Sequence, residues 1–161
     1  MSRIDSFIRR LEAQRACLDW AVVEIAGKPG VIMEIGLGNG RTYDHLREKC
    51  PGRTIYVFDR QIGAHPDCIP PAGNMLLGEF SETLPQAALR FKGQAALVHA
   101  DTGSGDAEGS RARAALWAPF WRDMLAVGGL LLSDQPLSLN GLQAMEPPAP
   151  AAMRYHVFRR A

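Results

Sequence analysis

Acidic residues recur at the ends of the short apolar segments of this 161-residue chain. Each stands at or near the carboxyl end of a segment whose β-branched and aliphatic residues predict a buried strand. The five acidic residues are Glu34, Asp59, Glu79, Asp101 and Asp134. A carboxylate at such a strand end can accept hydrogen bonds from both hydroxyls of a ribose. The pattern therefore indicates a polar ligand site that several strands build together.

A glycine-rich segment, Gly-Leu-Gly-Asn-Gly at 36–40, follows the first predicted strand and precedes a predicted helix. Glycines allow a tight turn there and bring backbone amides close to a ligand. Asp59 lies about twenty residues further on, at the end of the next predicted strand, which is the spacing of nucleoside-binding folds. A plain turn with a capping aspartate is the alternative interpretation. The combination favours a nucleoside-type ligand.

Hydrophobic periodicity predicts the elements that carry these residues. The predicted strands cover residues 31–36, 54–58, 74–77, 95–100 and 129–133. The predicted helices cover residues 3–26, 41–49, 82–91 and 108–126. In the last helix Leu116 is expected on the buried side, and Pro119 is expected to kink the helix or begin a second segment. A hairpin is predicted from residues 143–146 and 154–158.

Strands that alternate with helices are typical of parallel βαβ units. The sequence therefore predicts an α/β fold: a doubly wound, mostly parallel sheet with helices on both faces and a C-terminal antiparallel hairpin. Residues 1–161 are expected to form a single domain, since no repeat or polar linker divides them. The amphipathic helix within residues 1–27 is expected to pack on the sheet or over the ligand site.

Composition excludes several classes of protein. Eighteen basic residues against seventeen acidic ones give a net charge of +1, which argues against a nucleic-acid partner. No window approaches the roughly 18 apolar residues of a membrane span, and the first residues do not resemble a secretory signal. The three cysteines, Cys17, Cys50 and Cys68, form no CxxC motif and predict reduced thiols in a cytoplasmic protein.

Two nucleoside cofactors could use the glycine segment. A dinucleotide fingerprint needs a third glycine where this chain has Arg41, and that position must be small for helix and strand to pack closely. The pattern Glu34-x-Gly36-x-Gly38-x-Gly40 instead resembles motif I of the class I S-adenosylmethionine-dependent methyltransferases, and the resemblance extends over roughly residues 31–160. It implies S-adenosylmethionine as the cofactor.

The resemblance also implies roles for individual residues. Glu34 and the glycine segment would hold the methionine end of the cofactor, Asp59 the ribose, and the region around Glu79 the adenine. The expected cofactor-binding residues are Glu34, Gly36, Gly38, Asn39, Gly40, Asp59, Arg60, Gly78, Glu79, Phe80 and Asp101. Carboxylates suit this ligand, because it carries a sulfonium cation and no phosphate.

The function implied is methyl transfer from S-adenosylmethionine to an unidentified small acceptor. Asp101 and His99 are the candidate catalytic residues, although a strand-end histidine can equally be structural. No metal ligand is assigned, although Asp101, Asp134 and Gln135 resemble the metal site of catechol-type O-methyltransferases. A second subunit could complete the site, so the sequence leaves open that the protein forms a homo-oligomer. The alternatives are a non-catalytic nucleoside-binding module and an NAD-dependent oxidoreductase.

Overall fold

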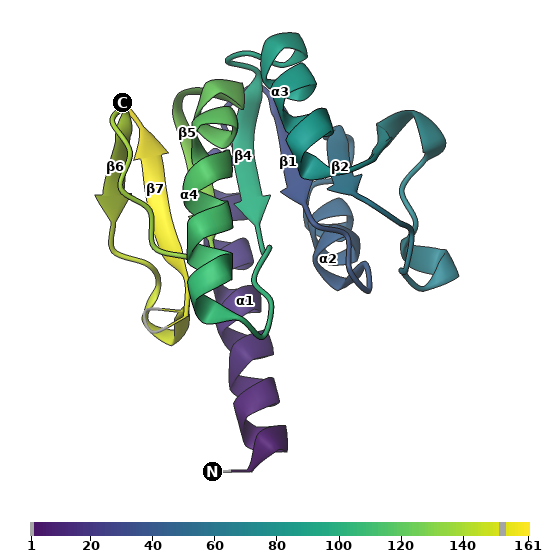
Figure 1. Cartoon of the computed structure of the whole chain (residues 1–161), viewed down its shortest axis with the longest axis vertical. Coiled ribbons are helices and arrows are strands. Elements are labelled where there is room, and N and C mark those ends of the chain that lie inside the picture. The colour runs from purple at the N-terminus through teal and green to yellow at the C-terminus, as the bar shows by residue number, and fades with distance from the viewer. Residues whose placement is uncertain (1, 152–153) are drawn as a thin grey trace.

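One seven-stranded sheet forms the centre of the molecule, in the strand order β3-β2-β1-β4-β5-β7-β6 (Figure 1). The computed structural model describes residues 2–151 and 154–161. The strands are β1 (Val31–Ile35), β2 (Ile55–Asp59), β3 (Met75–Leu77), β4 (Ala95–Ala100), β5 (Leu125–Ser133), β6 (Leu142–Met145) and β7 (His156–Arg160). Strands β1 to β5 are parallel, whereas β7 pairs antiparallel with both β5 and β6. The predicted fold class is confirmed.

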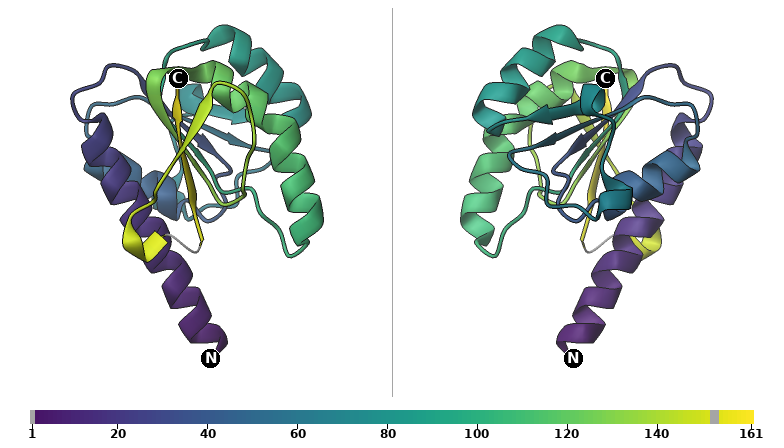
Figure 2. Two further views of the ribbon diagram at one scale, coloured as in Figure 1. Left: turned by 90° about the vertical axis from the view of Figure 1, so that its left-hand side faces the viewer. Right: turned by 90° about the vertical axis from the view of Figure 1, so that its right-hand side faces the viewer.

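Helices cover both faces of this sheet (Figures 1 and 2). They are α1 (Arg3–Ile25), α2 (Arg41–Lys49), α3 (Phe80–Arg90) and α4 (Ala107–Met124), with short 3-10 turns at Pro66–Cys68, Ala72–Asn74 and Ala149–Ala151. The chain enters α1 through a capping box, in which Ser2 Oγ accepts from the Asp5 amide at 3.0 Å and Asp5 Oδ2 accepts from the Ser2 amide at 3.2 Å. No helix within the described residues is long and apolar enough to cross a membrane.

Two apolar cores lie on opposite faces of the sheet. Ile32 and Leu97 belong to the core under α1 and α2, whereas Met33 and Val98 belong to the core under α3 and α4. Successive side chains of a strand point to opposite faces, so neighbouring residues enter different cores. This explains why the parallel strands are almost continuously apolar.

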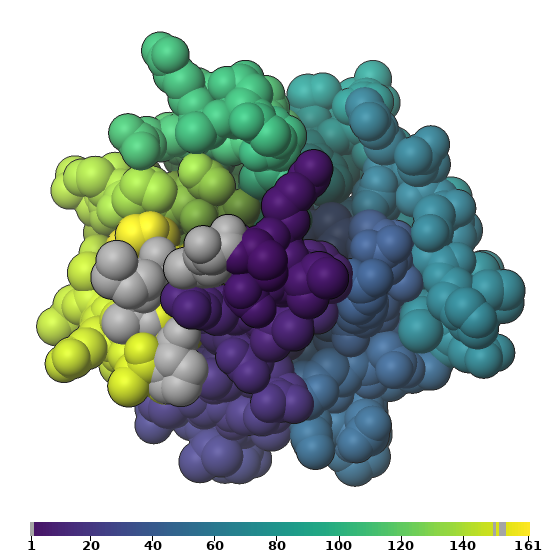
Figure 3. All heavy atoms as spheres, turned by 90° about the horizontal axis from the view of Figure 1, so that it is seen from below, coloured from purple at the N-terminus to yellow at the C-terminus, as the bar shows by residue number. Residues whose placement is uncertain are grey.

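The strand order reverses between β1 and β4. From β1 the chain adds β2 and β3 on one side of the sheet, and it then returns to add β4 and β5 on the other side of β1. The carboxyl ends of the parallel strands point downward in Figure 1, and Figure 3 shows the molecule from that side. The first turns of α1 lie across the middle of this surface, beside a hollow (Figure 3). In open α/β sheets a ligand binds at such a switch point.

The structure corrects several details of the sequence prediction. Leu116 is 67% exposed, because Ala114, Ala118 and Trp121 occupy the face of α4 that meets the sheet. Helix α4 continues through Pro119, so no second segment begins there. Strand β5 begins at Leu125, four residues before the predicted start.

The apolar stripe of α1 is buried only along part of the helix. Its C-terminal part packs on the sheet through Cys17, Leu18 and Ile25, which are at most 2% exposed. Ile4 near its start is 70% exposed. The helix is longer than the sheet that it covers, so its first turns extend past the strand ends (Figures 1 and 2).

Candidate active site

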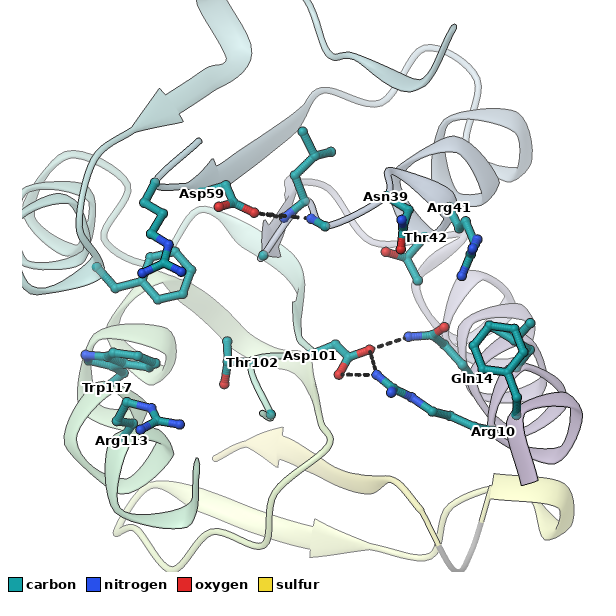
Figure 4. Close-up of a pocket in the computed structure, with 18 of the residues that line it drawn as sticks. Arg10, Gln14, Asn39, Arg41, Thr42, Asp59, Asp101, Thr102, Arg113 and Trp117 are labelled. Carbon is teal, nitrogen blue, oxygen red and sulfur yellow. Dashed lines mark hydrogen bonds and ion pairs between the residues drawn. The ribbon is translucent and has the colours of Figure 1, made fainter. Parts of the chain in front are cut away.

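A cavity of about 620 Å³ lies at the carboxyl ends of the parallel strands. Its wall is built from six places in the chain: the first half of α1, the glycine segment with the start of α2, the end of β2, the start of α3, the loop after β4, and α4 (Figure 4). These segments are far apart in the sequence, and the doubly wound topology brings them to one edge.

Asp59 holds the glycine segment in place. Its Oδ2 accepts hydrogen bonds from the Leu37 amide at 2.9 Å and the Gly38 amide at 3.2 Å (Figure 4). Its Oδ1 accepts from the Gln61 amide at 3.3 Å, close to the upper limit for such a bond. The carboxylate therefore orders the segment and still has acceptor capacity facing the cavity.

Asp101 is the centre of a second polar cluster. Its carboxylate accepts from Arg10 Nη2 at 3.2 and 3.3 Å and from Gln14 Nε2 at 2.7 Å (Figure 4). Gln14 Nε2 also donates to the Tyr155 hydroxyl at 2.7 Å. Burial raises the pKa of Tyr155 above its ordinary value, and the nearby charge of Asp101 adds to this, so Tyr155 acts as a neutral hydrogen-bonding group. The cluster joins α1 to the ends of β4 and β7.

An aromatic pair forms another part of the cavity wall. Phe80 at the start of α3 meets Trp117 of α4 edge to face, with ring centroids 5.0 Å apart. Arg113 lies one turn before Trp117 and points toward the same space (Figure 4). Such a wall suits a planar heteroaromatic group.

Two observations indicate that the cavity is built for a ligand. Thr102 Oγ1 is buried and has no hydrogen-bond partner among the described residues, although Thr102 lines the cavity. A buried hydroxyl without a partner is costly, and a ligand could satisfy it. A Cβ built on Gly38 meets no atom within 4 Å, so the backbone there faces open space.

A family model described as S-adenosyl-L-methionine methyltransferase matches residues 1–160. The chain belongs to this family. It is an S-adenosylmethionine-dependent methyltransferase, and the cofactor is S-adenosylmethionine. No curated protein matches the chain.

Solved structures agree with this assignment. An S-adenosyl-L-methionine methyl transferase from Silicibacter pomeroyi DSS-3 is 44% identical, with a TM-score of 0.94 over 100% of this chain and 99% of that one. The S-adenosylhomocysteine-bound Podospora anserina methyltransferase PaMTH1 is 14% identical, with a TM-score of 0.61 over 89% and 77%. The Burkholderia thailandensis 1,6-didemethyltoxoflavin-N1-methyltransferase is 15% identical, with a TM-score of 0.52 over 91% and 79%. The last two likenesses concern the fold alone.

The structure brings most of the predicted site residues of this methyltransferase to one cavity. The predicted residues that line it are Gly36, Gly38, Asn39, Asp59, Arg60, Glu79, Phe80 and Asp101. They come from four separate segments at the carboxyl ends of the strands, so their convergence is a property of the fold. The carboxylates among them are suited to a ligand that carries a cation and a ribose.

Glu34 and His99 lie beneath the cavity and do not line it. Both are fully buried, and they are register partners in the adjacent strands β1 and β4. Glu34 Oε2 and His99 Nδ1 are 2.8 Å apart, and Thr42 Oγ1 of α2 donates to the other oxygen of Glu34. The strand pleat turns both side chains toward α1 and α2, so the structure does not bring His99 to the substrate space.

Two predicted glycines have packing roles outside the cavity lining. At Gly40, whose φ is 82°, a Cβ would stand 2.6 Å from the Cβ of Cys68. Gly78 adopts a φ of 143° in the turn between β3 and α3. Both conformations favour glycine.

Several other residues that line the cavity were not predicted from the sequence. They are Phe7, Arg10, Leu11, Gln14, Leu37, Arg41, Thr42, Thr102, Gly103, Arg113 and Trp117. Leu37 lies within the glycine segment, and Arg41 and Thr42 follow it directly, so the motif could have predicted their position at the cavity. No local sequence signal marks the residues of α1 and α4 as cavity residues.

Asp134 and Gln135, the alternative metal ligands, make hydrogen bonds within the protein. Asp134 Oδ2 accepts from the Gly103 amide and from Gln135 Nε2, both at 2.9 Å, and Oδ1 accepts from the Thr102 amide at 3.3 Å. Burial raises the pKa of Asp134 above its ordinary value, although these hydrogen bonds act in the opposite direction. Within residues 2–151 and 154–161 no three His, Cys, Asp or Glu side chains are grouped so that they could hold a metal ion.

Proposed function

We propose that S-adenosylmethionine binds in the 620 Å³ cavity with its nucleoside toward β2 and α3 and its methionine end toward β1 and β4. The observation that carries this proposal is the position of Asp59. Its carboxylate orders the amides of Leu37 and Gly38 and lies on the cavity wall at the carboxyl end of β2. An acceptor group there can bind ribose hydroxyls while it shapes the segment that contacts the rest of the cofactor.

The other lining groups support the same orientation. Phe80 and Trp117 offer an aromatic wall for the adenine, and Glu79 stands beside them. The amides of Gly36, Leu37, Gly38 and Gly40 donate within the protein, which leaves the Asn39 amide and the hydroxyl of Thr102 for the methionine end. Glu34 supports that segment from below through Thr42, so we assign it a positioning role.

Methyl transfer needs the acceptor atom in line with the sulfonium methyl group, so most of the catalysis comes from holding the two reactants together. S-Adenosylmethionine supplies the electrophilic methyl group. Asp101 lies where the methionine end of the cofactor would meet an acceptor, and an acceptor that carries an N–H or O–H must lose its proton there. We propose Asp101 as the candidate group that orients the acceptor or takes this proton, and we do not propose His99 for that role.

The Asp59→Ala variant tests the cofactor assignment. We expect it to weaken the binding of S-adenosylhomocysteine by about 1.5–3 kcal/mol, or about 10- to 150-fold, the usual contribution of hydrogen bonds to a charged group. Isothermal titration calorimetry measures this directly. The fold should survive, because Asp59 is half-buried at a strand end and outside both cores.

Glu48→Ala is the matched control for that experiment. Glu48 is on the outer side of α2, and its side chain is 73% exposed. Its removal should leave the affinity for S-adenosylhomocysteine unchanged. An unchanged affinity in a folded Asp59→Ala variant would mean that the ribose lies elsewhere.

Three further expectations belong to this proposal. The acceptor is expected to be small, an expectation supported by the Burkholderia enzyme of similar fold, whose structure holds the small molecule 1,6-didemethyltoxoflavin. A cytoplasmic location is expected because Cys17, Cys50 and Cys68 are free thiols.

A homo-oligomer is expected because the start of α1, beside the cavity, exposes apolar side chains. Size-exclusion chromatography with light scattering tests this expectation.

A further inference from the structure

A second cavity of about 500 Å³ adjoins the proposed cofactor cavity. Arg10, Asp101 and Gly103 line both spaces, so the Arg10–Asp101 ion pair stands at their junction. The second cavity extends from this junction across the end of β5 to Arg154 and Tyr155, just before β7. An acceptor must approach the donor from a neighbouring space, and this one shares a wall with the proposed cofactor site.

The lining of the second cavity is polar. Among the described residues that form it there is no aliphatic side chain, and the one aromatic residue, Tyr155, contributes a hydroxyl group. Most small-molecule pockets are lined mainly by apolar groups with a few polar ones. Such a lining offers hydrogen-bonding partners to an acceptor with polar groups.

The carboxylates of this cavity already have donors from the protein. Asp134 accepts from the amides of Thr102 and Gly103 and from Gln135. Asp101 accepts from Arg10 and Gln14. Asp101 therefore has a cationic partner in Arg10, whereas Asp134 is held by neutral donors.

Two arginines, Arg154 and Arg113, have N–H donors without a carboxylate partner among the described residues. Arg154 is exposed at the cavity, and no carboxylate lies within 4 Å of it among residues 2–151 and 154–161. Arg113 lines the first cavity, and its Nη2 donates to Ser104 Oγ at 3.0 Å in the loop after β4 and to Ser110 Oγ at 3.3 Å in α4, both neutral groups. A guanidinium presents five N–H donors in a planar fork that matches an oxyanion.

We infer that the second cavity is the acceptor site and that it takes a small molecule bearing an oxyanion, a carboxylate or a phosphate, which Arg154 binds. This inference rests on the cofactor position proposed above. Arg154 holds the anionic end away from the donor, and the nucleophile of the acceptor then lies at the Asp101 junction. In the transfer the nucleophile forms a bond to the methyl carbon and the sulfur–methyl bond breaks. The products are the methylated acceptor and S-adenosylhomocysteine, and any acceptor proton passes to Asp101 or water.

Binding of simple anions tests the inference without an activity assay. The protein is saturated with S-adenosylhomocysteine at low ionic strength, and two-dimensional NMR follows titrations with succinate and with inorganic phosphate. We expect saturable shifts at residues 101–105, 134–135 and 154–155 with at least one of the two anions, and none with neutral succinamide. The anion that binds more tightly identifies the group, carboxylate or phosphate, that the acceptor carries.

Arg154→Gln should weaken that binding by about tenfold or more, because it removes a charge-assisted hydrogen bond. Arg111→Gln is the matched control, since Arg111 is an exposed arginine of α4 that lines neither cavity. S-Adenosylhomocysteine binding without any saturable anion shift, or equal loss in both variants, overturns the acceptor site alone. Failure of S-adenosylhomocysteine to bind overturns the proposed cofactor site and the acceptor site together.

Discussion

Gly38→Val is expected to abolish the binding of S-adenosylhomocysteine. Gly38 adopts a φ of 51°, and its backbone faces the open cavity. A β-branched side chain would occupy ligand space, and the left-handed conformation costs such a residue about 1–2 kcal/mol. It would also disturb the hydrogen bond from the Gly38 amide to Asp59. Calorimetric titration well below the melting temperature of the variant measures the loss.

Gly52→Val separates backbone strain from the loss of ligand space. Gly52 also has a positive φ, 83°, and a Cβ built there meets no atom within 4 Å, but it lies in the turn between α2 and β2. We expect this variant to lose similar stability and to bind S-adenosylhomocysteine as the wild type does. Tight binding by a folded Gly38→Val variant would place the cofactor outside this cavity.

His99→Leu is expected to have the largest effect on stability, lowering the free energy of unfolding by about 3–5 kcal/mol. His99 and Glu34 form a fully buried pair at 2.8 Å. Removal of the imidazole leaves the Glu34 carboxylate in the core, where only Thr42 donates to it. Urea denaturation followed by circular dichroism measures the change.

The double variant Glu34→Leu/His99→Leu is the control for that experiment. Replacement of a whole buried pair by apolar residues of similar volume is often neutral or stabilising, so the double variant should recover much of the loss. A single variant that loses less than about 1 kcal/mol, well below the cost of an unpaired buried charge, would show that the pair carries no charge.

The stability that the Glu34–His99 pair contributes is expected to change with pH in one direction. Burial lowers the pKa of His99, but the charge of Glu34 and its hydrogen bond raise it, and the net result is a pKa above the ordinary value of 6.5. The stabilisation that comes from protonated His99 is therefore complete below pH 6.5 and is lost as the pH rises through the higher pKa of the folded state. The stability difference between wild type and His99→Leu should shrink as the pH is raised above 7. A difference that grows with pH would contradict this assignment.

The order of elements could be predicted from the sequence, because each depends on local patterns. The glycine segment at 36–40 predicts the turn between β1 and α2, and Asp59 predicts the end of β2. The start of α1 follows from the Ser2–Asp5 pair. The motif and the strand ends therefore predict that the site lies at the carboxyl edge of the sheet, where the structure has the cavity.

The depth of a side chain within that site was not predictable from its position along the chain. His99 and Asp101 both face α1, but His99 lies inside the strand under the helix, whereas Asp101 follows the strand end and reaches the cavity. Leu116 and Trp117 are neighbours in sequence, yet only Trp117 lines the cavity, because α4 packs on the sheet through Ala114, Ala118 and Trp121 and this rotation turns Leu116 to solvent.

The sequence by itself determined the fold class, the glycine segment and the acidic strand ends, since all of these depend on residues close together in the chain. Only the tertiary structure decided that Arg10 and Gln14 reach Asp101, from which they are separated by 91 and 87 positions. Those contacts depend on how far α1 extends past the sheet and on the rotation of the helix about its axis. Packing across the whole fold sets both quantities, because α1 is positioned by apolar contacts with distant strands.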